Sequence, residues 1–156
     1  MKPILLVHHS ANRDHSHPRG SLPALQACLQ AGTLAVEVDI AVLADGQFAL
    51  LHGPLLEDET TGRGPVAALT AAEVTALQHV RDGQASGVPV GLLSQALDLL
   101  AASSGQVELQ LDLKPDAYAS ADVLRRLAAS LEPVRDRVRV TSPSDWALRR
   151  LRALDP

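Results

Sequence analysis

Aromatic side chains are scarce in this 156-residue chain, at 2% of the sequence against 46% for all hydrophobic residues. Leucine, alanine and valine supply nearly all of the hydrophobic content, so we expect an aliphatic core. The single cysteine, Cys28, excludes an internal disulfide and is typical of a reducing compartment. A chain of this length is expected to form one domain, over residues 1–156.

Long hydrophobic runs and basic clusters are missing too. The first hydrophobic run, residues 4–7, is too short for the core of a signal peptide or for a membrane span. We therefore expect a cytoplasmic protein without a membrane span. The formal net charge of -4 comes from 14 basic and 18 acidic side chains, with no basic stripe. This balance argues against nucleic acid as a partner.

The hydrophobic pattern predicts strands that alternate with helices, as in parallel βαβ units. Strands are expected at residues 4–8, 34–43, 48–52, 107–113 and 137–141. Helices are expected after Ser21 and Thr70 and at residues 92–102, 121–131 and 144–154. Residues 53–68 and 82–91 are expected to be loops, and His79 is expected to be an ordinary surface residue.

The turn between two of these strands predicts how the strands pair. Residues 34–43 and 48–52 flank Asp45-Gly46, a dipeptide typical of tight hairpin turns. With a two- or four-residue turn centred there, Asp39 lies opposite His52 on one face of the hairpin. A three-residue turn with a bulge would instead shift the register by one residue.

The first of these strands carries two carboxylates. Glu37 and Asp39 are two residues apart, so they share one face of the strand at a backbone separation of ~6.5–7 Å. Two like charges inside a barrel mouth repel each other unless a cation lies between them, and Mg²⁺ or Ca²⁺ prefers such oxygen ligands. The alternative from spacing alone is a strand whose carboxylates simply face water.

Two further segments repeat this polar pattern. Asp112 and Lys114 share one face of the predicted strand at 107–113, so Asp112 is a candidate third ligand and Lys114 a candidate contact for an anion. His8 and His52 end predicted strands, where the active sites of β/α barrels lie, and histidine suits acid–base chemistry. A solvated polar face and structural histidines remain the alternatives. Cys28 is interpreted as a packing residue.

Read together, these segments resemble the glycerophosphodiester phosphodiesterase family from residue 4 to the C-terminus. The family's motifs include His-Arg-Gly, Glu-x-Asp, His-Asp-Pro, Thr-Thr-x-Gly-x-Gly, Leu-Thr-x-x-Glu, Glu-x-Lys and Ser-Phe-Asp. In the same order, this sequence has His8-His9-Ser10, Glu37-Val38-Asp39, His52-Gly53-Pro54, residues 60–64, residues 69–73, Asp112-Leu113-Lys114 and residues 142–145. The order and spacing of these motifs carry the resemblance.

The resemblance implies metal-dependent hydrolysis of a small glycerophosphodiester to glycerol 3-phosphate and an alcohol. It implies that Glu37, Asp39 and Asp112 bind the metal, Mg or Ca. It also implies that His8 and His52 form the acid–base pair, and that Lys114 and His9 contact the substrate phosphate. The implied fold is α/β, a TIM-type (β/α) barrel. At this length it would be incomplete, with about five of eight β/α units and a β-hairpin after the second strand.

The sequence departs from the family pattern at several positions. His9 stands where the family has its phosphate-binding arginine, with Arg19 or Arg13 as candidate replacements for that charge. Asp112 is one methylene shorter than the family's glutamate. The open sheet would expose strand edges that could pair with a second copy of the chain. The alternatives are an inactive relative that binds a phosphorylated ligand or a partner chain, and a different metal-dependent hydrolase.

Overall fold

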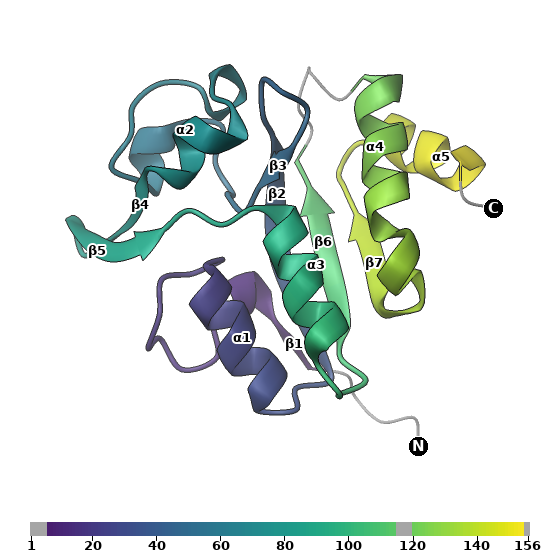
Figure 1. The fold of residues 1–156 in the computed structure, drawn as a ribbon, viewed down its shortest axis with the longest axis horizontal. Helices are drawn as coiled ribbons and strands as arrows, with labels where there is room; N and C mark the ends of the chain where they lie inside the picture. Colours follow the sequence, from purple (N-terminus) through teal and green to yellow (C-terminus); the bar gives the residue numbers. More distant parts are fainter. Residues whose placement is uncertain (1–5, 115–119, 155–156) are drawn as a thin grey trace.

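Four parallel strands form the centre of the molecule, as seen in a computed structural model that describes residues 6–114 and 120–154 (Figure 1). The sheet has the order β1-β2-β6-β7. Its strands are β1 (Val7–His8), β2 (Ala35–Val42), β6 (Glu108–Leu113) and β7 (Val138–Thr141). A fifth strand, β3 (Phe48–Ala49), pairs with β2 in the antiparallel direction. Each expected strand therefore has an observed counterpart, although residues 4 and 5 of the first lie outside the described residues. The strand expected at 48–52 ends at Ala49, so His52 lies in the loop after it and not at its end.

Helices cover one face of this sheet. They are α1 (Leu22–Gln30), α3 (Leu93–Ala102) and α4 (Ala121–Leu131), with α5 (Asp145–Leu154) packed against α4. Figure 1 shows α1, α3 and α4 side by side in front of the strands. The sheet residues beneath them are buried and aliphatic, and include Val36, Val38, Ile40, Leu109, Leu111 and Leu113. This aliphatic core is the one expected from the composition.

The predicted helix boundaries follow from capping. The Ser21 side chain accepts a hydrogen bond from the Ala24 N–H at the start of α1, and Gly32 takes a φ of +67° just after the helix ends. At α2 (Ala71–Thr75), Thr70 and Glu73 form the predicted capping box. No helix within residues 6–114 and 120–154 is both long and apolar enough to cross a bilayer.

The hairpin of β2 and β3 has a different register from the one predicted with a two- or four-residue turn. The observed partners are Ala41 with Ala49 and Val42 with Phe48, one residue away from the register that pairs Asp39 with His52. The turn holds three residues, 44–46, and is closed by a hydrogen bond from the Leu43 N–H to the Gln47 carbonyl oxygen. The prediction that Asp39 pairs with His52 is therefore wrong, and the alternative of a three-residue turn, which shifts the register by one residue, is the one observed.

A second hairpin replaces the loop predicted at residues 82–91. Strands β4 (Gln78–Arg81) and β5 (Gln84–Pro89) pair around Asp82 and Gly83, both with positive φ. The Asp-Gly dipeptide signals such a turn, but the flanking residues lack hydrophobic alternation. His79 on β4 is only 2% exposed, so its prediction as a surface residue is also wrong.

The long segment between β3 and β4 contains short 3-10 helices, η2 (Leu56–Asp58) and η3 (Val66–Ala68). Their side chains Leu56 and Val66 join a second hydrophobic cluster with Val74 of α2. Further 3-10 turns are η1 (His9–Ala11) after β1 and η4 (Glu132–Arg137) before β7. Together with the end of β2, the segments around η1 and η2 enclose the site described next.

Candidate active site

Three carboxylates converge on one face of the central strands β2 and β6. Glu37 and Asp39 come from β2 and Asp112 from β6, where Asp39 and Asp112 are direct partners in the parallel register. One oxygen of each residue lies within 4.8 Å of the others. Glu37 and Asp39 are 8% and 5% exposed. The alternative of a solvated carboxylate face therefore does not hold for β2, and the three acidic residues form one cluster.

Glu37 is held from the side of η1. Its Oε2 accepts a hydrogen bond of 2.7 Å from the backbone N–H of Ser10, and the His9 Nε2 lies 3.7 Å from the same oxygen. Ser10 and Ala11 both have a φ of 50°, a left-handed conformation that non-glycine residues rarely adopt. This turn directs the Ser10 N–H at Glu37. Burial raises the pKa of Glu37, against the opposing effect of the Ser10 hydrogen bond.

Lys114 is tied to the other two carboxylates. Its Nζ lies 2.6 Å from the Asp39 Oδ1 and 2.6 Å from the Asp112 Oδ2. Burial by itself would lower the pKa of Lys114, but the hydrogen bonds to Asp112 and Asp39 outweigh it and raise that pKa above its ordinary value. Lys114, which was predicted to contact the substrate phosphate, thus lies within the acidic cluster.

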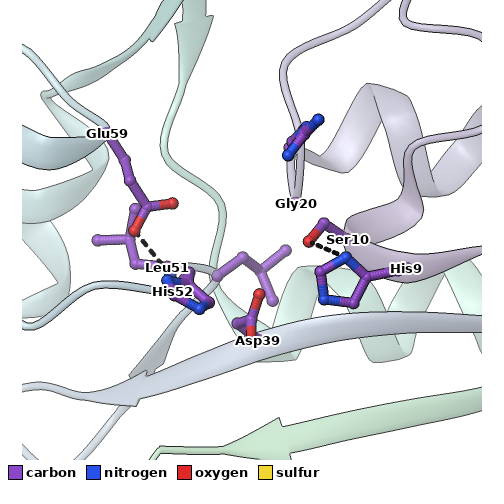
Figure 2. A pocket seen from close by; sticks show the side chains of 9 residues that line it. His9, Ser10, Gly20, Asp39, Leu51, His52 and Glu59 are labelled. Atoms are coloured by element: carbon purple, nitrogen blue, oxygen red, sulfur yellow. Dashed lines mark hydrogen bonds between the residues drawn. The ribbon is translucent and has the colours of Figure 1, made fainter.

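His9, and not His8, faces this cluster. In the parallel register His8 is the partner of Val36, so its side chain lies on the helix-covered side of the sheet, away from Glu37. His9 follows the strand and borders the cavity beside Asp39 (Figure 2). His8 therefore does not lie where the acid–base residue was expected, because its side chain is on the opposite face of the sheet from Glu37 and Asp39.

A cavity of about 260 Å³ borders Asp39 of the acidic cluster, and Figure 2 shows His9 and His52 on either side of Asp39. Its other wall residues are Ser10, Arg19, Gly20, Leu50, Leu51 and Glu59. Arg19 thus supplies a cationic side chain to the cavity, whereas Arg13 is paired with Asp14 at 3.4 Å. Of the two arginines considered from the sequence, Arg19 is the one that the fold brings to the site.

Glu59 is a site residue that the sequence analysis missed. Its Oε1 accepts hydrogen bonds from the backbone N–H groups of His52, at 2.8 Å, and Gly53, at 2.5 Å. Burial raises the pKa of Glu59, and the two N–H groups oppose that shift. No spacing rule links a loop glutamate to a backbone seven residues earlier, so the sequence held no signal for this contact.

A second cavity of about 420 Å³ adjoins the first through shared walls at Arg19 and Glu59. Polar side chains from the 12–19 loop and the β4–β5 hairpin dominate its lining, among them His15, His17 and Arg81. His79 also borders it, and burial lowers the pKa of His79 to about 4. At neutral pH His79 is therefore an uncharged wall residue.

The donor set of the acidic cluster fits a hard divalent cation. Three carboxylate oxygens within 4.8 Å of one another offer the ligand type that Mg²⁺ and Ca²⁺ prefer. A lysine and a nearby histidine leave the combined negative charge of Glu37, Asp39 and Asp112 only partly compensated. A set of carboxylate ligands for a cation, together with an arginine and two histidines around the adjacent cavity, is suited to binding and cleaving a phosphate ester.

Comparison with known proteins agrees with this chemistry. The model of the Glycerophosphoryl diester phosphodiesterase family matches residues 12–156. The chain belongs to this family. A glycerophosphodiester phosphodiesterase of Bacillus altitudinis is 24% identical over 131 residues, which cover 81% of this chain and 53% of that protein. The chain therefore spans about half the length of this curated relative of the glycerophosphoryl diester phosphodiesterase family.

Solved structures confirm the fold. A glycerophosphodiester phosphodiesterase from Agrobacterium tumefaciens str. C58 superimposes with a TM-score of 0.78 at 25% identity, covering 96% of this chain and 62% of that one. A phosphodiesterase from Oleispira antarctica, solved in complex with the product sn-glycerol-3-phosphate, also gives 0.78 at 24% identity, covering 96% and 62%. The described sheet is thus an open portion of the TIM-type barrel of this family.

Proposed function

We propose that this family member hydrolyses glycerophosphodiesters to glycerol 3-phosphate and an alcohol in a metal-dependent reaction. The observation that carries the proposal is the convergence of Glu37, Asp39 and Asp112 beside a cavity bordered by His9 and His52. The activity named for the Bacillus relative and the product bound to the Oleispira phosphodiesterase support the same chemistry and a small-molecule substrate.

Glu37, Asp39 and Asp112 would hold the divalent cation, with Mg and Ca as the proposed metals because all three ligands are hard oxygens. When bound, such an ion supplies positive charge that stabilises the phosphoryl oxygens in the transition state. Arg19 borders the same cavity and would pair with the phosphate through its guanidinium. It would take the part that the sequence analysis gave to His9.

His9 and His52 are the proposed acid–base pair, with His9 in place of His8. They come from opposite walls of the cavity, and Asp39 lies between them (Figure 2). One imidazole would accept the proton of the attacking hydroxyl, from water or from the glycerol of the substrate. The other would donate a proton to the oxygen of the leaving alcohol.

A second candidate function is binding of a phosphorylated ligand without turnover. The observation that favours it is His9, which stands where the family motif has its arginine, together with Gly53 in place of the aspartate after His52. The first change replaces a guanidinium with an imidazole, and the second removes a carboxylate next to His52. The unpaired outer edges of β1 and β7 within the described sheet would also allow pairing with a second chain.

Location and assembly belong to the proposal as well. We propose a cytoplasmic protein because its only cysteine is a buried, free thiol, and self-association through the outer edges of the sheet. Nucleic acid is not a proposed partner, since the net charge is -4.

The test is release of glycerol 3-phosphate from glycerophosphocholine in the presence of Mg²⁺, Ca²⁺ or Mn²⁺. We expect release by the wild type and its loss in His52→Ala, with metal affinity measured by calorimetry retained in the variant. Metal binding without any release would instead favour the non-catalytic function. Absence of metal binding at neutral pH would remove the hydrolase proposal.

A further inference from the structure

Lys114 has a place in the acidic cluster that differs from a phosphate contact. Its ammonium is shared between Asp39 Oδ1 and Asp112 Oδ2, at 2.6 Å from each. The Lys114 side chain is 23% exposed, and those of Asp39 and Asp112 are 5% and 25% exposed. The ion pairs are therefore partly shielded from solvent, where screening is weaker than on an open surface.

These two oxygens belong to the same residues that would ligate a divalent cation. An ion bound to them at ~2.0–2.6 Å would stand in contact with an ammonium that lies equally close, and the two positive charges would repel each other. Glu37 is anchored differently, by the Ser10 N–H and His9 on its other side. The conflict between metal and lysine thus concerns Asp39 and Asp112.

We propose that Lys114 is an internal counter-ion that a divalent cation displaces from Asp39 and Asp112, and that displacement frees its ammonium for the substrate phosphate. This inference rests on the proposed function, because it concerns the same metal ligands. Lysine suits the exchange, since its charge sits on a flexible four-carbon stem. Metal and phosphate binding are then coupled, so each raises the affinity for the other by the same factor.

A permanent replacement of the metal by Lys114 is the main rival. One ammonium offsets one of the three carboxylate charges, and His9 approaches only Glu37. Two buried like charges without compensation are unfavourable, so the cluster retains an attraction for a divalent ion even with Lys114 in place. This attraction is the driving force by which the divalent ion displaces Lys114.

The chain offers a direct probe, because Lys2 and Lys114 are its only lysines. In protein labelled with ¹³C at the lysine Cε, Lys114→Arg assigns the two signals, and Lys2 is the internal control. We expect Mg²⁺ or Ca²⁺ to shift the Lys114 signal, and glycerol 3-phosphate to shift it again only when metal is present. A Lys114 signal that stays in place at saturating metal would overturn the inference.

Calorimetry provides the second arm. We expect Lys114→Met to bind Mg²⁺ or Ca²⁺ about tenfold more tightly than the wild type, a coupling typical of linked sites. The matched control is Arg139→Gln, which breaks the ion pair between the exposed Arg139 of β7 and Glu108 of β6 and is expected to leave metal affinity unchanged. Equal or weaker metal binding by Lys114→Met would contradict displacement.

The two proposals fail in distinguishable ways. If metal binds but the Lys114 signal does not shift, only the proposed displacement of Lys114 is contradicted. Metal binding by Lys114→Met but not by the wild type supports the competition and removes the metal-dependent hydrolase proposal. Absence of metal binding in both proteins removes both. If Lys114→Met does not fold, as judged by circular dichroism, the lysine signals of the wild type decide the question.

Discussion

The carboxylate of Glu59 fixes the backbone at His52, because its Oε1 accepts hydrogen bonds from the N–H groups of His52 and Gly53 at 2.8 and 2.5 Å. Removing it with Glu59→Ala would free the loop and misplace the His52 imidazole. Because misplacement of a catalytic group by about 1 Å costs up to ~100-fold in rate, we expect kcat for glycerophosphocholine to fall roughly tenfold or more. Steady-state kinetics would measure this.

Two controls accompany that measurement. Glu59→Gln retains an oxygen that accepts both N–H groups, so it should keep most of the kcat that Glu59→Ala loses. Glu57→Ala removes a nearby exposed carboxylate that accepts the Gly64 N–H outside the cavity, and should leave kcat unchanged. A Glu59→Gln variant as impaired as Glu59→Ala would show that charge, and not loop position, is what matters.

The two adjacent histidines should behave differently. His9 borders the cavity 3.7 Å from Glu37, whereas His8 lies beside Val36 on the other side of the sheet. Acid–base residues typically contribute ~10²–10⁴ in rate, so His9→Gln should lose at least about 100-fold in kcat and His8→Gln should retain most activity. The reverse order would restore the role predicted for His8 from the sequence.

His79 should make folding sensitive to mild acid. Burial lowers the pKa of its imidazole from 6.5 to about 4, so between these values the unfolded chain binds a proton that the folded chain does not. Its contribution to stability is therefore full above pH 6.5 and is lost as the pH falls toward 4. For a drop from pH 7.5 to 5 the loss is about 2 kcal/mol.

Urea denaturation at both pH values measures this loss. The raised pKa values of Glu37 and Glu59 act in the opposite direction, because the folded state then binds more protons than the unfolded state. Comparing the wild type with His79→Gln cancels those contributions, and the variant should lose about 2 kcal/mol less stability over this range. His15→Gln, at an exposed position, should behave like the wild type.

Gly46 determines the three-residue turn between β2 and β3. Its φ is +78°, and a Cβ there would also lie 2.8 Å from the Cζ of Arg126. Gly46→Ala should therefore reduce the free energy of unfolding by about 1–2 kcal/mol. Gly105→Ala is the control, because its Cβ meets only Val107 at an ordinary 3.5 Å. Equal losses in both variants would mean that the turn imposes no special conformation.

Much of the fold could be predicted from local signals. Alternation placed Glu37 and Asp39 on one face and the aliphatic core on the other, and the Thr70 capping box marked the start of α2. These features depend on residues within a few positions of one another. The same is true of Ser21 at the start of α1, so sequence periodicity and capping rules were sufficient for each.

The errors lie where the structure depends on geometry between segments. The β1–β2 register, which pairs His8 with Val36, determines which face of the sheet each of His8 and His9 occupies. This register cannot be read from the positions of the strand ends alone. His79 is buried because β4 pairs with the Thr60 segment, a contact made across a loop. The contact of Glu59 with His52 likewise depends on how η2 folds back. None of these is encoded in periodicity.

The most direct test of the central claim is a single titration that follows both metal occupancy and glycerol 3-phosphate release. Metal-stripped protein is titrated with Mg²⁺ or Ca²⁺ in the presence of glycerophosphocholine, beside Asp39→Asn. The account predicts that release rises from zero in step with occupancy of one site per chain and that Asp39→Asn weakens both. Release that is complete without metal, or unaffected in Asp39→Asn, would contradict it.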